Sequence, residues 1–286
     1  MLCLKKRRIE SPTSILTYMQ CPRKYFYHYI QRLPQMPSIH LIAGDIAHKT
    51  IQAFHNTDTS TVMPEGFFDK MRNKITEQFD QKWQEKTQEL ARLDLSPEEK
   101  HLHYHKTQEM VINFYQHHTN KILAYKRYYG LTLFEAWQKL KPRTETSLTS
   151  ENYGITGRID AIHDIDGETT IIDYKTSKNN EMTTDCVFQL AIYSLLHKEN
   201  FGRMPDKAGI HFLRHGEIVM PTSQELLNLA QNTCHRIHQQ TTSDDIQNYP
   251  REISGLCKYR TGQCDYYQQC MEKRNNLKAS SHTRKF

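Results

Sequence analysis

The sequence has no run of about 18 apolar residues, the length that a membrane-spanning helix needs. Its first residues, MLCLKKRRIESPTS, are basic but have no apolar stretch behind them, so we do not expect a secretory signal. We also find no internal repeat, no low-complexity linker and no G-x-x-x-x-G-K-[ST] loop for a nucleotide. These absences argue against a membrane protein and an ATP motor, and they favour a cytoplasmic location.

The composition is that of a globular protein, with 37% hydrophobic and 24% charged residues among 286. A chain of this length can bury a substantial core without disulfides, and we expect one domain over residues 1–286. The net charge of +6 is compatible with nucleic acid, although many solvated surfaces are equally basic. Seven cysteines in a reducing compartment call for metal binding or for simple burial.

The first half of the chain is predicted to be helical. A helix over residues 11–32 starts at Ser11-Pro12 and is interrupted at Cys21-Pro22, and a second covers Gly44 to Phe54. Two long helices follow between about 65 and 128, the second from about Pro97. The first of them has an apolar residue at every fourth position: Met71, Ile75, Phe79 and Trp83. We therefore expect a helical insertion over about residues 56–128.

The pattern changes to alternation after Lys141-Pro142. We expect strands over residues 143–149, 155–163, 169–175 and 208–214, and helices over 185–196 and 225–239. Asp166-Gly167 is a hairpin turn signal, and His215-Gly216 suggests a second turn. Mixed strands and helices of this kind predict an α/β layer fold.

The hairpin around Asp166-Gly167 carries three chemically useful side chains. Residues i and i+2 of a strand share a face, so Asp173 and Lys175 should project together while Tyr174 faces the other way. The turn should bring Asp160, near the end of the first hairpin strand, close to them. Two carboxylates and an ammonium suit hydrolysis of a phosphodiester bond by Mg²⁺ or Mn²⁺. A surface salt bridge is the alternative, but the buried Ile171-Ile172 run makes unpaired charge there costly.

Three further residues extend this candidate site. Gln189 and Tyr193 are spaced i, i+4 and share one helix face, so both could bind a phosphate or hold the lysine. Core packing of Tyr193 with ordinary solvation of Gln189 is the alternative. His48 could offer an imidazole ligand to the metal, although a lone helical histidine is more often structural.

Together, the segments SPTSILTYMQCPRKYFYHYI, GDIAH, GRID, DYK and QLAIY resemble, in order, the RecB-like branch of the PD-(D/E)XK nuclease superfamily. The resemblance implies a restriction-endonuclease-like mixed central sheet flanked by helices. It also implies metal ligation by His48, Asp160, Asp173 and the backbone carbonyl of Tyr174. Lys175 would be catalytic, with Gln189 and Tyr193 supporting the site and the DNA. The middle helices match no motif of the family.

The cysteines add to the resemblance. Relatives in the CRISPR-adaptation and exonuclease V groups hold a [4Fe-4S] cluster by one N-terminal and three C-terminal cysteines, which here would be Cys21, Cys257, Cys264 and Cys270. Such a cluster would staple the two ends of the domain. Six residues separate Cys257 from Cys264, a longer gap than in the family, so a zinc ion is the alternative. Cys3, Cys186 and Cys234 are expected to be ordinary thiols.

The resemblance favours a metal-dependent exonuclease that acts on single-stranded DNA ends in DNA repair or CRISPR spacer processing. Tyr259, Tyr266 and Tyr267 near the cluster could stack on bases or belong to the core. A non-catalytic DNA-binding subunit is the alternative function, though its acids are intact. The third possibility is a subunit of a helicase–nuclease machine, and a helicase or a CRISPR integrase subunit is the partner that such roles imply.

Overall fold

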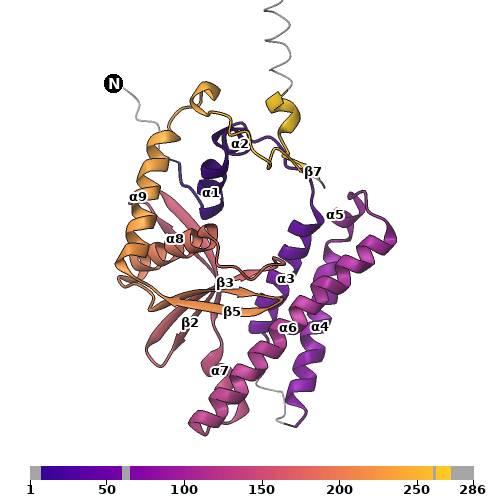
Figure 1. Ribbon diagram of the computed structural model, residues 1–286. Helices are drawn as coiled ribbons and strands as arrows, with labels where there is room; N and C mark the ends of the chain where they lie inside the picture. Colours follow the sequence, from indigo (N-terminus) through magenta and orange to yellow (C-terminus); the bar gives the residue numbers. More distant parts are fainter. Residues whose placement is uncertain (1–7, 60–64, 260–261, 272–286) are drawn as a thin grey trace, which may run out of the picture. The chain divides into compact units, whose positions relative to one another are not determined.

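The computed structural model describes residues 8–59, 65–259 and 262–271. The chain divides into two compact units (Figure 1). One unit comprises Met1–Met36, Glu151–Ile155 and Asn232–Phe286, and the other comprises Pro37–Ser150 and Thr156–Gln231. We call them the terminal unit and the sheet unit. The expectation of a single domain over residues 1–286 stays a prediction.

The sheet unit contains most of the regular structure. Its helices are α3 (Ile39–His55), α4 (Phe67–Glu85), α5 (Thr87–Ala91), α6 (Pro97–Tyr129), α7 (Leu133–Leu140) and α8 (Thr184–Phe201). Its strands are β1 (Arg143–Ser150), β2 (Ile155–Ile165), β3 (Glu168–Lys175), β4 (Lys207–Phe212) and β5 (Gly216–Pro221). Helix α9 (Gln224–Gln240) follows β5 and continues into the terminal unit.

The five strands form one mixed sheet in the order β1-β2-β3-β4-β5. β2 and β3 are an antiparallel hairpin, β3 and β4 run parallel, and β4 and β5 are again antiparallel. A parallel pair needs a crossover, and α8 supplies it between β3 and β4. The predicted mixed sheet flanked by helices is therefore confirmed, and β3 lies at its centre.

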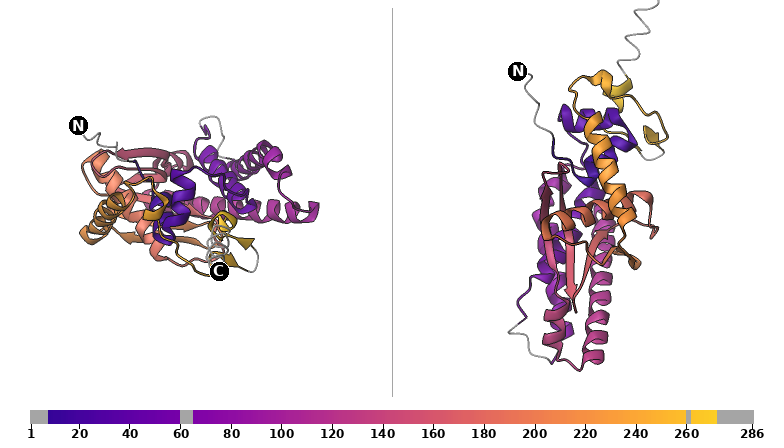
Figure 2. Two further views of the ribbon diagram at one scale, coloured as in Figure 1. Left: turned by 90° about the horizontal axis from the view of Figure 1, so that it is seen from above. Right: turned by 90° about the vertical axis from the view of Figure 1, so that its left-hand side faces the viewer.

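Helices cover both faces of this sheet. α8 packs against β1, β3 and β4. On the other face, α3, α4 and α6 lie side by side (Figures 1 and 2). Their apolar residues form one core with Ala161, Ile172 and Tyr174 of the sheet. Phe54 and Trp137 meet edge to face in it, with ring centroids 5.2 Å apart.

Local sequence signals explain the helical layer. Met71, Ile75 and Phe79 of α4 are buried in the core, as their fourfold spacing predicts. α6 begins at a capping box in which the Ser96 and Glu99 side chains bond each other's backbone N–H groups. It ends at Gly130, whose φ of 67° suits a residue without a Cβ.

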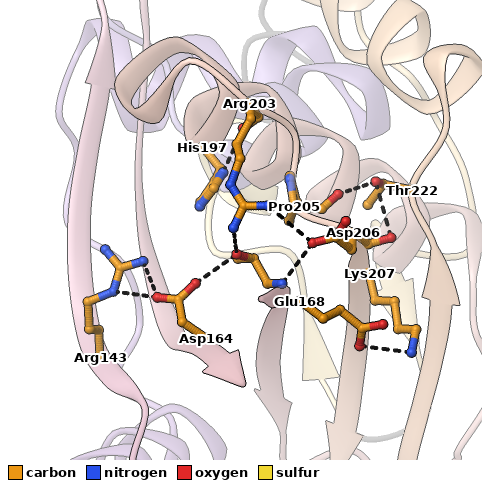
Figure 3. Close-up of polar contacts among 10 residues, drawn as sticks. Arg143, Asp164, Glu168, His197, Arg203, Pro205, Asp206, Lys207 and Thr222 are labelled. Carbon is orange, nitrogen blue, oxygen red and sulfur yellow. Dashed lines mark hydrogen bonds and ion pairs between the residues drawn. The ribbon is translucent and has the colours of Figure 1, made fainter. Parts of the chain in front are cut away.

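A polar network stabilises the end of the sheet at which β3 begins (Figure 3). The Thr169 hydroxyl donates to Asp164 over 2.7 Å, and Asp164 also pairs with Arg143 of β1. The Thr169 N–H donates to Asp206, which precedes β4, over 2.8 Å. These bonds tie the ends of four segments together and leave the opposite end of β3 for other side chains.

The terminal unit contains α1 (Pro12–Gln20), α2 (Pro22–Tyr25), the π-helical turn η1 (Phe26–Ile30), the 3-10 turn η2 (Ile246–Asn248) and the short strands β6 (Lys258–Tyr259) and β7 (Gly262–Gln263). The predicted interruption at Cys21-Pro22 separates α1 from α2. Arg23 joins the two ends of the chain, because its side chain donates to the Tyr249 carbonyl over 2.8 Å and its N–H to the Pro250 carbonyl.

Several boundaries differ from the predictions. α3 begins at Ile39 rather than near Gly44, because Ser38 caps it. The sequence analysis did not predict α7 or β5. Each is a single short run of residues, and its periodic or alternating pattern is too brief to stand out. Within the described residues, no helix combines the length and the apolar character that crossing a membrane would require.

Buried histidines make this fold sensitive to acid. Burial, with neighbouring histidines, lowers the pKa of His118 to about 3, from 6.5 in an unfolded chain. The unfolded state therefore binds the extra proton between pH 6.5 and 3, and stability falls as the pH drops through that range.

We expect His118→Leu to reduce this dependence by about 1.4 kcal/mol per pH unit below 6.5, measured by urea unfolding at pH 7 and pH 5. His105→Leu, which changes an exposed histidine on the same helix, should keep the dependence of the unaltered protein. An unchanged slope in the His118 variant would contradict this assignment.

Candidate active site

The C-terminal end of β3 carries the carboxylate and the ammonium that the sequence predicts there. Asp173 and Lys175 project to the face covered by α8, and the Lys175 ammonium lies 2.9 Å from a carboxylate oxygen of Asp173. Tyr174 projects the opposite way, where its ring packs against Phe114 of α6. Asp173 is only 3% exposed, because Ile171, Ile172 and the neighbouring strands surround it. The predicted alternation along this strand is confirmed.

Asp160 comes to Asp173 through the register of the hairpin. Ala161 pairs with Ile172, so Asp160 is the next residue beside Asp173. One oxygen of Asp160 accepts the Tyr174 N–H over 2.7 Å, and the other lies 3.3 Å from Nδ1 of His48 on α3. Asp160 stands in the middle of β2 rather than near its end, as we had expected, because β2 continues to Ile165.

Gln189 joins the acid and the lysine. Its amide oxygen accepts a 2.6 Å hydrogen bond from Lys175, and its amide nitrogen donates to Asp173 over 2.7 Å. The same nitrogen lies 2.9 Å from the Tyr193 hydroxyl, one helical turn further along α8. The i, i+4 spacing therefore does hold the lysine, and the solvated Gln189 of the alternative is not found.

The electrostatics of the group follow from burial. Burial, opposed by Lys175 and assisted by Asp160, raises the pKa of Asp173 to about 6. Burial disfavours the Lys175 ammonium, but the carboxylate of Asp173 outweighs it and raises the pKa of the lysine. The hydrogen bond to Asp160 likewise raises the pKa of His48 against the effect of burial. Each of these ionisable groups is thus held beside a group of opposite charge.

Glu145 is a site residue that the sequence analysis missed. His48, Glu145 and Asp160 each offer a ligand atom, and these atoms lie within 4.8 Å of one another. Glu145 has a φ of 51°, an uncommon conformation for a residue with a side chain and one often found at functional sites. Its carboxylate also lies 2.6 Å from Arg158 of β2. The only signal in the sequence was one acid on the strand before the GRID segment.

The donor set suits a hard divalent cation. It consists of carboxylate oxygens from Glu145 and Asp160 with one imidazole from His48, and Asp173 lies on the strand beside Asp160. The Asp173 oxygen nearest Lys175 is buried and has no other hydrogen-bonding partner among the described residues, so it retains a lone pair. Mg²⁺ and Mn²⁺ take such ligands. Ligation by the Tyr174 carbonyl stays a prediction.

The four predicted cluster cysteines all belong to the terminal unit. Cys21, Cys257, Cys264 and Cys270 are unbridged and half-buried. Burial raises the pKa values of Cys264 and Cys270, and the thiol of Cys21 raises both further, so these side chains lie in one neighbourhood. Tyr266 is buried in the core, whereas Tyr259 is 51% exposed. Cys186 and Cys234 lie apart on α8 and α9, and Cys3 lies outside the described residues.

Comparisons with known proteins give one family. The model of the PD-(D/E)XK nuclease superfamily matches residues 10–271. Among solved structures, a candidate exonuclease from Eubacterium rectale is 12% identical, with 88% of this chain and 86% of that chain covered and a TM-score of 0.48. The structure of SSO0001 is 16% identical, with 51% and 77% covered and a TM-score of 0.28. No curated protein matches the sequence.

Gly157 makes room for the tyrosine of this site. A Cβ at this position would lie 2.8 Å from Cδ1 of Leu196 and 3.0 Å from the Tyr193 ring. We expect Gly157→Ala to displace α8 and to lower the free energy of unfolding by about 1–3 kcal/mol, measured in urea. Gly255→Ala, where a Cβ meets nothing within 4 Å, is the control. Equal stability of the two variants would show that the close approach costs nothing.

Proposed function

Because the chain belongs to the PD-(D/E)XK nuclease superfamily, we propose that it hydrolyses phosphodiester bonds in DNA with the help of Mg²⁺ or Mn²⁺. One observation carries the proposal: Asp160, Asp173 and Lys175 meet at the end of one hairpin, with the lysine held 2.9 Å from Asp173. A structural ion pair would not need the second carboxylate, which raises the pKa of Asp173 rather than lowering it. Perturbed acids grouped in this way are typical of catalytic sites.

His48, Glu145, Asp160 and Asp173 would hold the cation, and the backbone carbonyl of Tyr174 would complete the set. When bound, the metal supplies a nucleophile at neutral pH and offsets the charge of the phosphate. The Lys175 ammonium, 2.9 Å away, favours the ionised carboxylate of Asp173, which is the form that can ligate. The hydrogen bond from the Tyr174 N–H orients Asp160, so that its other oxygen faces His48.

Lys175 is the positively charged side chain that we assign to the substrate. Its ammonium can donate to the phosphate or to the attacking water, and it stabilises the negative charge that accumulates in the transition state. Gln189 restricts the ammonium to one position, because it accepts from the lysine while it donates to Asp173. Tyr193 is a positioning residue in turn, since its hydroxyl lies beside the Gln189 amide.

We propose single-stranded DNA ends as the substrate, in DNA repair or in CRISPR spacer processing. The resemblance to iron-sulfur exonucleases supports this choice, as does the exposed Tyr259, whose ring can stack on a base. A helicase or a CRISPR integrase subunit is the partner we propose, and co-purification with this chain tests it.

Removing the lysine or the central acid should abolish cleavage while the fold persists. We expect Lys175→Met and Asp173→Asn each to lower the rate at least about 100-fold with Mg²⁺ or Mn²⁺, because each removes transition-state stabilisation. The assay uses end-labelled single-stranded and double-stranded DNA, and the pattern of products separates cleavage at ends from internal cleavage.

Lys74→Met is the matched control, since it removes an exposed lysine of α4 that pairs with Glu77 on its own helix. Full activity of the Lys175 variant would overturn the proposed site. Binding of DNA by the unaltered protein without cleavage under either metal would instead identify a non-catalytic DNA-binding subunit.

We further propose that Cys21, Cys257, Cys264 and Cys270 hold a [4Fe-4S] cluster. A tetrahedral zinc site with Zn–S bonds of about 2.3 Å brings its sulfurs within about 4 Å of one another. Four thiolates suit a soft iron-sulfur cluster as well as zinc. The cluster would fasten the C-terminal segment to α1 and α2.

Anaerobically purified protein should therefore contain about four iron atoms per chain and absorb visible light. We expect Cys21→Ser to lose both the iron and the absorption, whereas Cys186→Ser, which changes a half-buried thiol of α8, should retain them. Stoichiometric zinc with no iron would favour the alternative. Iron retained in the Cys21 variant would contradict the ligand set.

A further inference from the structure

A second group of metal ligands lies in the sheet unit, on the side of the sheet away from Asp173 and Lys175. His211 of β4 and Glu217 of β5 are directly opposed in the antiparallel ladder. Opposed residues of such a pair point to the same face with their Cβ atoms about 5 Å apart. The hairpin therefore places the His211 imidazole and the Glu217 carboxylate side by side. Both residues belong to strands of the sheet, not to loops.

His117 of α6 completes the group. Its Nε2 lies 3.2 Å from a carboxylate oxygen of Glu217, and its ring meets His211 edge to face with centroids 4.7 Å apart. One ligand atom from each of the three residues falls within 4.8 Å of the others. Two imidazoles and one carboxylate are a recurrent zinc donor set that leaves the fourth position open.

The space among these side chains has the size of an ion with its water. A cavity of about 20 Å³ is lined by His117, His211 and Glu217, and a single water needs about 10–15 Å³ on this measure. His55 and His118 also line this cavity, and each has a buried ring nitrogen without a hydrogen-bonding partner in the described structure. Buried polar atoms normally have partners, so these orphans point to a missing polar occupant.

A larger pocket adjoins the cavity. A pocket of about 370 Å³ lies beside it, and Lys121, His163 and Glu217 line both. Lys121 contacts the Glu217 carboxylate and neutralises it in the structure without metal. Its side chain is 44% exposed, so it can turn to solvent when a cation takes its place.

We propose that His117, His211 and Glu217 form a Zn²⁺ site, with water in the fourth position, that fastens α6 to the β4–β5 hairpin. Imidazole nitrogen distinguishes this site from the oxygen-rich group at Asp160, which favours Mg²⁺ or Mn²⁺. The proposal is independent of the nuclease activity, because its three ligands differ from every residue assigned to that reaction.

The test is zinc binding by the full chain after treatment with a chelator and dialysis. Equilibrium dialysis with metal analysis gives the number of ions bound and their affinity. Thiols and the acids near Asp173 can also take zinc, so the readout is the difference between the unaltered protein and His117→Gln or Glu217→Gln. We expect each variant to lose one equivalent, or to bind it about 100-fold more weakly, since even outer partners of a ligand contribute about 10–100-fold.

Co²⁺ provides a second readout that separates this site from the cysteines. The ion that is lost in the variants should show weak visible d–d bands without thiolate charge transfer. His117 is partly exposed, so His117→Gln should fold, and thermal unfolding without metal checks this. His215→Gln, in the turn between β4 and β5, is the matched control and should bind as the unaltered protein does. Unchanged stoichiometry and affinity in both ligand variants would overturn the proposal.

Discussion

The pairing of β2 with β3 is the constraint on which the candidate active site depends. Because Ala161 pairs with Ile172, the two aspartates occupy adjacent positions on neighbouring strands. A shift by one residue would turn Asp160 to the other face and bury it among the apolar residues. The Asp166-Gly167 turn fixes that register at one end, and the bond from the Tyr174 N–H to Asp160 fixes it at the other. The hairpin by itself therefore sets the positions of Asp160 and Asp173 relative to each other.

The buried charge at this hairpin is tolerated because each group has several partners. An isolated carboxylate at the position of Asp173 would be costly to ionise, and its raised pKa reflects that cost. Lys175 and Gln189 reduce the cost with one ion pair and one hydrogen bond. The compensation is incomplete, because the neighbouring carboxylate of Asp160 still raises the pKa of Asp173. The buried carboxylate at the end of this central strand therefore depends on these partners.

Patterns of period two and period four made much of this arrangement predictable. The alternation around Asp173 and Lys175 fixed their common face, and the four-residue spacing placed Gln189 beside the lysine and Tyr193 beside Gln189. Glu145 was not predictable, because its participation depends on a positive φ that breaks the alternation of β1. In the sequence, His48 is a lone histidine within a predicted helix. Its place in the site follows from the packing of α3, which brings its ring to Asp160 of β2. Distances between segments far apart in sequence are set by packing, which no local pattern encodes.

Alternation along two parallel strands also explains how one sheet can carry two polar groups. Tyr174 pairs in register with His211, so both side chains project to the face covered by α6 while Asp173 and Lys175 project to α8. The Tyr174 ring packs against Phe114 and His211 on the face covered by α6. Any ion bound at His211 therefore adjoins the strand of the candidate nuclease site without sharing a ligand with it. Each face of this strand can then be changed by mutation while the other keeps its chemistry.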